Sequence, residues 1–180
     1  MKKKLNWKKI KLVLLDVDGV LTNGMITYHS DGTESKTYNV KDGRGIIEAN
    51  LCGIEFGIIT ARESETVSRR AKDLNIKYLY QNSKNKVDAL NDILNKTGFS
   101  TDEIMYIGDE VIDIPVMLKV GISATVKDCS KDVLKAADFI SSKNGGTGAV
   151  REILEHLLKK QNKWNLHIKK YFNAKNAAGF

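Results

Sequence analysis

Short apolar runs alternate with longer amphipathic stretches along most of this chain. The strand-like runs are 11–15, 55–59, 104–107, 122–126 and 139–140, and the helix-like stretches lie near 43–51, 63–74, 84–96, 111–119, 130–136 and 147–160. This alternation is typical of a parallel sheet with helices on both faces. Active sites in such α/β proteins gather at the carboxyl ends of the strands. We therefore expect the chemistry of this chain where its apolar runs end.

One segment departs from this rhythm. Met25 to Tyr28 and Ser35 to Val40 alternate with a period of two on either side of Asp31-Gly32, which is a hairpin turn signal. The pattern predicts a β-hairpin inserted straight after the first strand. A plain surface flap fits this position, and so does a lid or subunit-contact element, which the place of emergence favours.

The chain has the length of one domain. Its 180 residues contain a single proline, Pro115, and no Ser/Gly-rich linker or repeat. We expect one domain over 1–180, with a core at about 10–160 and a basic C-terminal tail at 161–180.

The net charge of +7 belongs to the two ends of the chain. Residues 1–11 and 159–180 hold six lysines each and no acids, which leaves 17 Lys and Arg against all 22 acids between them, a net charge of about −5. This distribution favours solvated tails over a nucleic-acid-binding surface, although contact of a tail with a polyanion or acidic surface remains open.

Cysteine and hydropathy patterns indicate an intracellular protein. Cys52 and Cys129 lack the number and spacing of a disulfide framework or a zinc site. The apolar run at 12–15 is too short for a signal peptide and is followed by Asp16, and no transmembrane segment is present. We expect no membrane partner and a cytoplasmic location.

Two carboxylates stand where the first apolar run ends. Asp16 and Asp18 are two residues apart, and such a pair needs a positive charge nearby. Mg²⁺ would supply one. Asp16 could then hold the metal and attack phosphorus, while Asp18 protonates the leaving oxygen and later deprotonates water. Alternatively, the two residues are ordinary acids in a surface turn.

The next two segments suit a phosphate group. Thr60-Ala61-Arg62 ends the second run in a hydroxyl followed by backbone amides and a helix start, although an N-cap threonine explains this equally well. Lys86, near the start of a later helix, could neutralise the phosphate and Asp16, although a single lysine is more often solvated.

A third strand end repeats the acidic pattern. Asp109 follows the run at 104–107 and is a natural second carboxylate ligand. Asp113, one helical turn later, could orient Lys86 or a metal-bound water. Two acidic strand ends in one parallel sheet can meet at one ion.

Taken in order, these segments resemble the motifs of the haloacid dehalogenase superfamily, over about residues 12 to 154. Within it the chain is similar to the 3-deoxy-D-manno-octulosonate 8-phosphate phosphatases, a capless branch in lipopolysaccharide sugar synthesis. The likeness is carried by the segments Asp16 to Thr22, Val40 to Gly43, Thr60 to Arg62, Gly108 to Asp113, and Gly145 to Glu152.

The resemblance implies a Rossmann-like fold, a magnesium-dependent hydrolysis through an aspartyl-phosphate, and a homotetramer in which one subunit's hairpin helps cover a neighbour's site. It implies magnesium bound by Asp16, the backbone carbonyl of Asp18, and Asp109, with Thr60 and Lys86 holding phosphate. Arg62 stands where the related nononate phosphatases tend to carry an acid, and a guanidinium suits a carboxylated sugar phosphate.

Three positions depart from the family pattern: Ala61 and Asn82 replace glycines, and Glu110 replaces an aspartate. None removes a catalytic group. Two alternatives stay open, a phosphatase of a nine-carbon ketoacid 9-phosphate and a non-catalytic tetramerisation module of a sugar-activating system.

Overall fold

The computed structural model describes residues 5–173, and its centre is a parallel sheet of six strands in the order β5-β4-β1-β6-β7-β8. The strands are β1 Leu12–Leu15, β4 Glu55–Ile59, β5 Tyr78–Tyr80, β6 Ile104–Ile107, β7 Ile122–Thr125 and β8 Phe139–Ile140. Every neighbouring pair is parallel. The predicted Rossmann-like α/β fold is confirmed.

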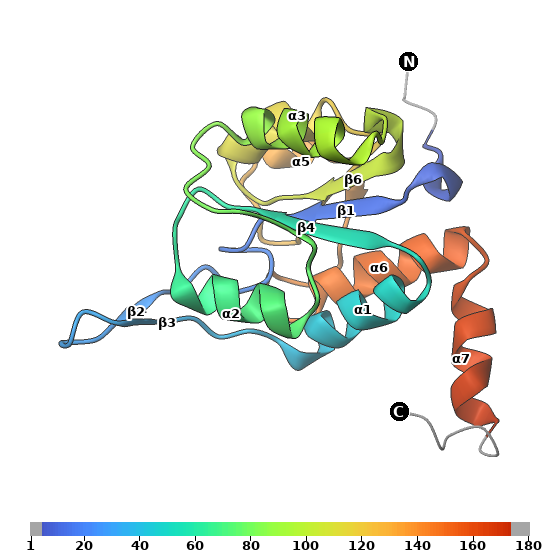
Figure 1. The fold of residues 1–180 in the computed structure, drawn as a ribbon, viewed down its shortest axis with the longest axis horizontal. Coiled ribbons are helices and arrows are strands. Elements are labelled where there is room, and N and C mark those ends of the chain that lie inside the picture. The colour runs from blue at the N-terminus through green and yellow to red at the C-terminus, as the bar shows by residue number, and fades with distance from the viewer. Residues whose placement is uncertain (1–4, 174–180) are drawn as a thin grey trace.

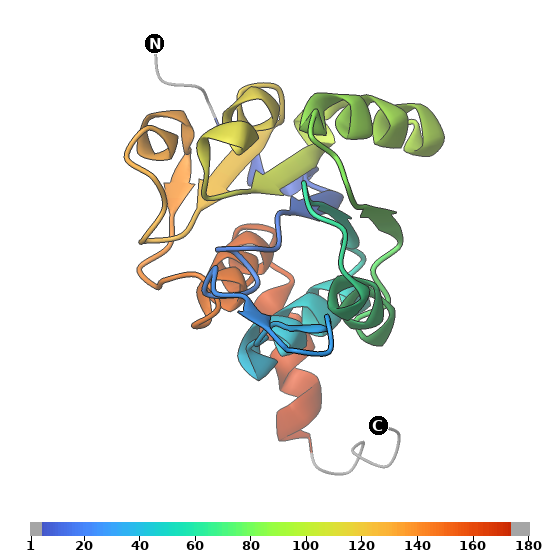
Figure 2. The same cartoon turned by 90° about the vertical axis from the view of Figure 1, so that its left-hand side faces the viewer.

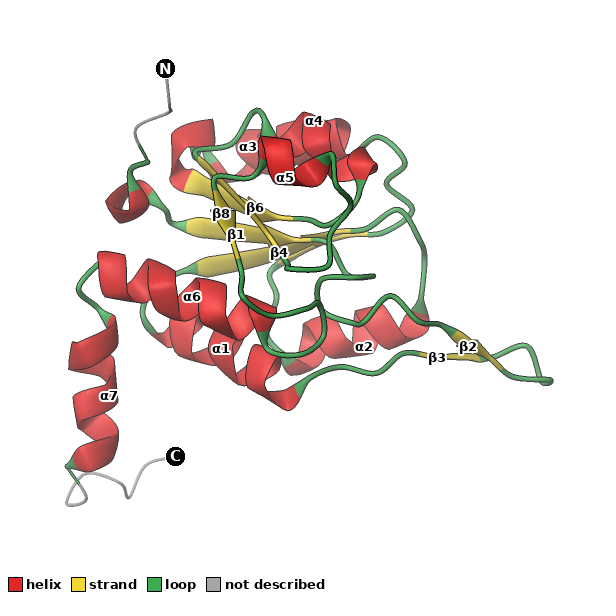
Figure 3. Cartoon of the chain, turned by 180° about the vertical axis from the view of Figure 1, so that it is seen from behind, coloured by secondary structure: helices red, strands yellow, loops and turns green. Residues whose placement is uncertain are grey.

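Helices cover both faces of this sheet, as Figures 1 and 3 show. Val13 and Leu15 point into one core with helices α1, α2 and α6, whereas Leu12 and Leu14 point into the other with α3, α4 and α5. The helices are α1 Val40–Leu51, α2 Glu65–Asp73, α3 Lys86–Thr97, α4 Ile114–Met117, α5 Val133–Ala136, α6 Ala149–Lys160 and α7 Trp164–Phe172. Because neighbours in a strand face opposite ways, a strand buried on both faces must be apolar throughout, as β1 is.

The predicted hairpin is present and projects from the body of the molecule (Figure 1). Its strands are β2 Thr27–Tyr28 and β3 Glu34–Ser35, with Tyr28 opposite Glu34. Gly32 adopts a φ of 85° in the turn, a conformation that glycine takes without strain.

Two sequence expectations need correction. β5 was not expected as a strand, because its three residues show no clear apolar pattern. The stretch at 111–119 is a 3₁₀ turn, η3 Val111–Asp113, followed by the short α4. Within the predicted basic tail at 161–180, Trp164–Phe172 forms the helix α7, while 174–180 lie outside the described residues.

Two further 3₁₀ turns complete the architecture, η1 Trp7–Lys9 and η2 Thr101–Glu103. In the part of the chain from 5 to 173, the structure contains no helix with the length and apolarity needed to cross a bilayer.

Candidate active site

The strand ends bring the predicted residues to one edge of the sheet, which Figure 2 views from the side on which the hairpin projects. Asp16 follows β1, and its amide donates a hydrogen bond to the carbonyl of Ile107 in β6 (2.9 Å). Thr60 follows β4, and its amide donates to the carbonyl of Tyr80 in β5 (2.9 Å). The sheet's own hydrogen bonding therefore fixes where both side chains begin.

Three carboxylates converge at this edge, and we call Asp16, Asp109 and Asp113 the acid cluster. One oxygen of each lies within 4.8 Å of the other two. Asp16 and Asp113 are buried, with exposures of 6% and 0%. Glycine permits this approach, since a Cβ at Gly19 would lie 2.0 Å from Oδ2 of Asp109 and the φ of Gly19 is +92°.

Lys86 supplies the cation that faces the acid cluster. Asn85 caps α3 by accepting a hydrogen bond from the amide of Val87, which places Lys86 at the first helical position. The buried Nζ of Lys86 lies 2.9 Å from Oδ1 of Asp16 and 2.6 Å from Oδ1 of Asp113. The lysine predicted from the sequence is therefore an interior group and not a solvated one.

Asp113 is saturated by protein donors. Besides Lys86, it accepts hydrogen bonds from the hydroxyl of Tyr106 (2.5 Å) and from the amides of Asp109 (3.0 Å) and Glu110 (3.1 Å). A carboxylate with this many donors is held in one orientation. The arrangement suits a residue that positions Lys86 and the loop after β6.

The acid cluster carries more negative charge than the protein neutralises. Burial raises the pKa of Asp109 to about 8, and repulsion from Asp16 and Asp113 adds to this. Burial likewise raises the pKa of Asp16 to about 6, although Lys86 opposes the shift. Oδ1 of Asp109 is buried without a hydrogen-bond partner. A hard divalent cation would satisfy this oxygen and offset the surplus charge, so the residues fit Mg²⁺.

Asp18 points away from the acid cluster and toward the hairpin. Its Oδ1 contacts Nζ of Lys36, just beyond β3, and its Oδ2 lies 3.9 Å from Nε of Arg62. The side chain of Lys36 has no exposure to solvent. The two predicted carboxylates of the β1 end thus have different surroundings, as two roles require.

The loop after β4 contains the other predicted site residues. Thr60 is buried, Ala61 is half-buried and Arg62 is exposed. The helix after this loop begins at Glu65 with Ser64 as its N-cap. Thr60 is therefore not an N-cap residue, which removes that structural explanation.

Two of the family-like segments serve packing. The carboxylate of Asp42 accepts hydrogen bonds from the amides of Gly148 (3.1 Å) and Arg151 (2.8 Å), at the start of α6. A Cβ at Gly145 would lie 1.7 Å from the carbonyl oxygen of Gly19. The segment Gly145 to Glu152 therefore packs directly against the loop that carries Asp16 and Asp18.

Two of the three departures from the family pattern have local explanations. Asn82 has a φ of 55°, and asparagine tolerates this left-handed conformation better than other non-glycine residues. Glu110 is exposed, and its side chain caps η3.

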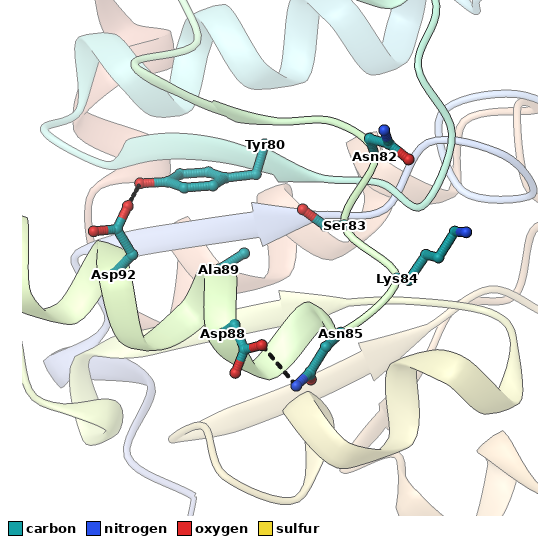
Figure 4. Close-up of a pocket in the computed structure, with 8 residues that line it drawn as sticks. All are labelled: Tyr80, Asn82, Ser83, Lys84, Asn85, Asp88, Ala89 and Asp92. Atoms are coloured by element: carbon teal, nitrogen blue, oxygen red, sulfur yellow. Dashed lines mark hydrogen bonds between the residues drawn. The ribbon is translucent and has the colours of Figure 1, made fainter.

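An open pocket of about 460 Å³ lies beside this site, between β5 and α3 (Figure 4). Within it the hydroxyl of Tyr80 donates to Asp92 and the amide of Asn85 donates to Asp88. Its lining is Tyr80, Asn82, Ser83, Lys84, Asn85, Asp88, Ala89 and Asp92. No residue of the acid cluster is among them, so this pocket is separate from the predicted chemistry.

Comparisons with known proteins show the family of this chain. Residues 78–154 match the family described as haloacid dehalogenase-like hydrolase. The 3-deoxy-D-manno-octulosonate 8-phosphate phosphatase of Escherichia coli is 43% identical over 156 residues, which cover 87% of this chain and 83% of that protein. The chain belongs to this phosphatase family.

Solved structures of family members have the same fold. The 3-deoxy-D-manno-octulosonate 8-phosphate phosphatase of Moraxella catarrhalis, in complex with magnesium ion, phosphate ion and KDO, matches with a TM-score of 0.90 and 39% identity over 92% of this chain and 95% of that one. The cobalt-bound deoxy-D-mannose-octulosonate 8-phosphate phosphatase of Haemophilus influenzae has a TM-score of 0.85 and 34% identity, covering 89% and 94%.

Sequence reasoning missed three neighbours of the site. Tyr106 donates to Asp113, and its only signal was a hydroxyl in an otherwise apolar strand. Glu34, in β3, contacts Arg62, and Lys36, just after β3, contacts Asp18. The two contacts span separations of 28 and 18 positions along the sequence, and no local pattern reveals contacts over such separations.

Proposed function

We propose that this protein is a magnesium-dependent phosphatase that hydrolyses 3-deoxy-D-manno-octulosonate 8-phosphate to the free sugar acid and phosphate, in lipopolysaccharide sugar synthesis. The observation that carries the proposal is the contact of Asp16 with Lys86 beside the surplus carboxylate Asp109. This arrangement suits phosphoryl transfer to a carboxylate, and the relatives at 43% identity are named for that substrate.

The proposed reaction has two steps. A carboxylate oxygen of Asp16 attacks phosphorus and forms an aspartyl-phosphate, while the bond from phosphorus to the sugar oxygen breaks. Asp18 gives its proton to that leaving oxygen. Asp18 then takes a proton from water, whose oxygen attacks phosphorus and releases inorganic phosphate and Asp16.

The remaining site residues bind and position. Lys86 offsets negative charge on Asp16 and on the phosphoryl oxygens, and Asp113 holds Lys86 in place. Thr60 and the backbone of Ala61 are proposed to donate hydrogen bonds to the phosphate. Arg62 is proposed to pair with the substrate carboxylate, which a guanidinium can bind through two parallel hydrogen bonds.

Asp16, Asp109 and the backbone carbonyl of Asp18 are the proposed ligands of Mg²⁺. When bound, the ion supplies positive charge that orients the phosphoryl group and stabilises charge on its oxygens.

The first experiment measures phosphate release from 3-deoxy-D-manno-octulosonate 8-phosphate with magnesium and with EDTA, for the wild type and for Asp16→Asn. Rapid magnesium-dependent release that the variant lacks is the expected result. A nine-carbon ketoacid 9-phosphate is measured in parallel. A wide preference for it, or no release by well-folded wild type, would overturn the proposed substrate.

Three broader proposals accompany this function. We propose that residues 1–180 act as one domain, on the length and the lack of a linker, and that the protein is cytoplasmic, on its cysteine and hydropathy patterns. We also propose that it is a homotetramer, which rests on the family resemblance. Sedimentation equilibrium tests the tetramer, and cell fractionation tests the location.

A further inference from the structure

A chain of four charged side chains joins the hairpin to the loops after β1 and β4. Lys36 contacts Oδ1 of Asp18, and Nε of Arg62 lies 3.9 Å from Oδ2 of the same carboxylate. Nη2 of Arg62 lies 3.3 Å from Oε2 of Glu34. This chain of side chains holds two cations and two anions, so it has no surplus charge.

The nitrogen of Arg62 that every two-bond contact with a carboxylate uses, Nη2, already donates hydrogen bonds within the protein. Nη2 carries two hydrogens and donates to the hydroxyl of Tyr28 (2.9 Å) and to Glu34 (3.3 Å). A carboxylate bound through two parallel hydrogen bonds needs Nη2 together with either Nη1 or Nε. Both arrangements therefore require a hydrogen that Tyr28 or Glu34 now holds.

The hairpin places the two acceptors of Arg62, Tyr28 and Glu34, side by side. Tyr28 and Glu34 are directly opposite each other in the β2–β3 pair, so their side chains leave the same face of the ribbon. The side chain of Arg62 is 43% exposed and that of Glu34 is 18% exposed. A ligand can thus reach the guanidinium, whereas the carboxylate of Glu34 is largely covered.

We propose that Glu34 is an internal stand-in for the substrate's carboxylate, which displaces Glu34 from Arg62 when a carboxylated sugar phosphate binds. Glu34 is then a specificity-determining residue. It neutralises Arg62 in the free protein, and only an anion that makes the two-bond contact replaces it. This inference rests on the proposed function, because it takes a sugar acid phosphate as the substrate.

If Glu34 competes in this way, it lowers kcat/KM for carboxylated substrates and leaves kcat/KM for other sugar phosphates unchanged. Glu34→Gln keeps a hydrogen-bond acceptor beside Arg62 but removes the competing charge. We expect the ratio of kcat/KM for 3-deoxy-D-manno-octulosonate 8-phosphate to kcat/KM for ribose 5-phosphate, which lacks a carboxylate, to rise at least about fivefold, mainly through KM.

Two further variants make the test specific. Glu55, the first residue of β4, is another partly exposed glutamate that pairs with a cation, Lys77 (3.1 Å), and it also accepts from the hydroxyl of Tyr78 (2.7 Å). Glu55→Gln is therefore a matched control, and its ratio should not change. In an Arg62→Met background, Glu34→Gln should also leave the ratio unchanged, which a general structural effect of Glu34 would not produce.

The outcomes are decisive in each case. A rise in the ratio with Glu34→Gln, absent from Glu55→Gln and from the Arg62→Met background, supports the stand-in. An unchanged ratio overturns it, and a lower ratio overturns it in favour of Glu34 orienting Arg62. If wild type does not hydrolyse the octulosonate phosphate at all, the proposed function fails and the inference falls with it, a result distinct from the other two.

Discussion

Two groups of side chains in this protein, each built around a buried carboxylate, are balanced in opposite ways. The acid cluster has three carboxylates and one cation, Lys86. The second group, which we call the α7 cluster, has one carboxylate and three partners: the carboxylate of Glu48 in α1 contacts Arg44, His167 and Tyr171.

The pKa values follow this difference in charge. Burial and repulsion from Asp16 raise the pKa of Asp109 to about 8. Burial alone would raise the pKa of Glu48 as well, but hydrogen bonds from His167 and Tyr171 and the charge of Arg44 bring it below its ordinary value. The α7 cluster is satisfied by the protein, whereas the acid cluster is completed only by a ligand. This contrast favours a structural role for the α7 cluster and supports the functional role proposed for the acid cluster.

The sharpest test of this contrast is Asp16→Asn. We expect turnover to fall by at least about 10⁴-fold, because the proposed nucleophile is lost. The metal-free variant should melt no lower than wild type, since it relieves repulsion while Asp113 still holds Lys86. Steady-state kinetics and thermal unfolding in EDTA measure the two effects. A lower melting temperature with normal turnover would reverse the roles assigned to the two clusters.

Lys86→Met should impair both properties. Removing Lys86 takes away the cation that pairs with the buried carboxylate of Asp113, which costs about 3–5 kcal/mol of unfolding free energy. We also expect kcat to fall by about 10²–10³-fold with magnesium present. Denaturant unfolding and kinetics give the two values. Lys77→Met is the control, because Lys77 is 60% exposed in its pair with Glu55 and its loss should leave the unfolding free energy nearly unchanged.

Glu48→Gln should affect stability only. The α7 cluster then loses its anion, and we expect a loss of about 2–3 kcal/mol of unfolding free energy, reduced from the fully buried case because Arg44 is half-exposed. The kcat of the folded variant should equal that of wild type. Urea unfolding monitored by circular dichroism measures the loss. A fall in kcat without a loss of stability would contradict a purely structural role.

Magnesium should raise the unfolding free energy of wild type by less than the changes expected for Lys86→Met and Glu48→Gln, and by an amount that depends on pH. At ten times its Kd the ion contributes about 1.4 kcal/mol. The gain should be larger at pH 8 than at pH 6, because protonated Asp109 cannot bind a cation and its pKa of about 8 means that low pH favours the proton. Melting temperatures with and without magnesium at both pH values check this. An undiminished gain in Asp109→Asn would remove Asp109 from the ligand set.

The sequence predicted the acid cluster better than the α7 cluster for a physical reason. Asp16 and Asp109 follow strands of one parallel sheet, and parallel strands end at a common edge, so local patterns were enough to bring them together. The roles assigned to these residues stay predictions. His167 and Glu48 lie 119 positions apart on two helices, and no period or motif relates them.

The two other wrong predictions, at residues 111–119 and at β5, arose where tertiary contacts compete with the local sequence preference. Residues 111–119 have a helical pattern, but Asp113 takes the amides of Asp109 and Glu110, and the segment begins as a 3₁₀ turn. β5 is recognised only through its pairing with β4, because Tyr78–Tyr80 is partly exposed along its length. In both segments tertiary contacts outweighed the local preference.

The central place of β1 also has a consequence for synthesis of the chain on the ribosome. Leu12 pairs with Glu55 on one side and with Ile104 on the other, so the first strand to emerge is the one that must wait longest for both neighbours. At about 5–20 residues per second, β6 follows β1 by about 5 to 20 seconds. During that interval a wholly apolar strand has an open edge, which other nascent chains could pair with. The strand that positions the proposed nucleophile is therefore also the segment of the growing chain most in need of chaperone cover.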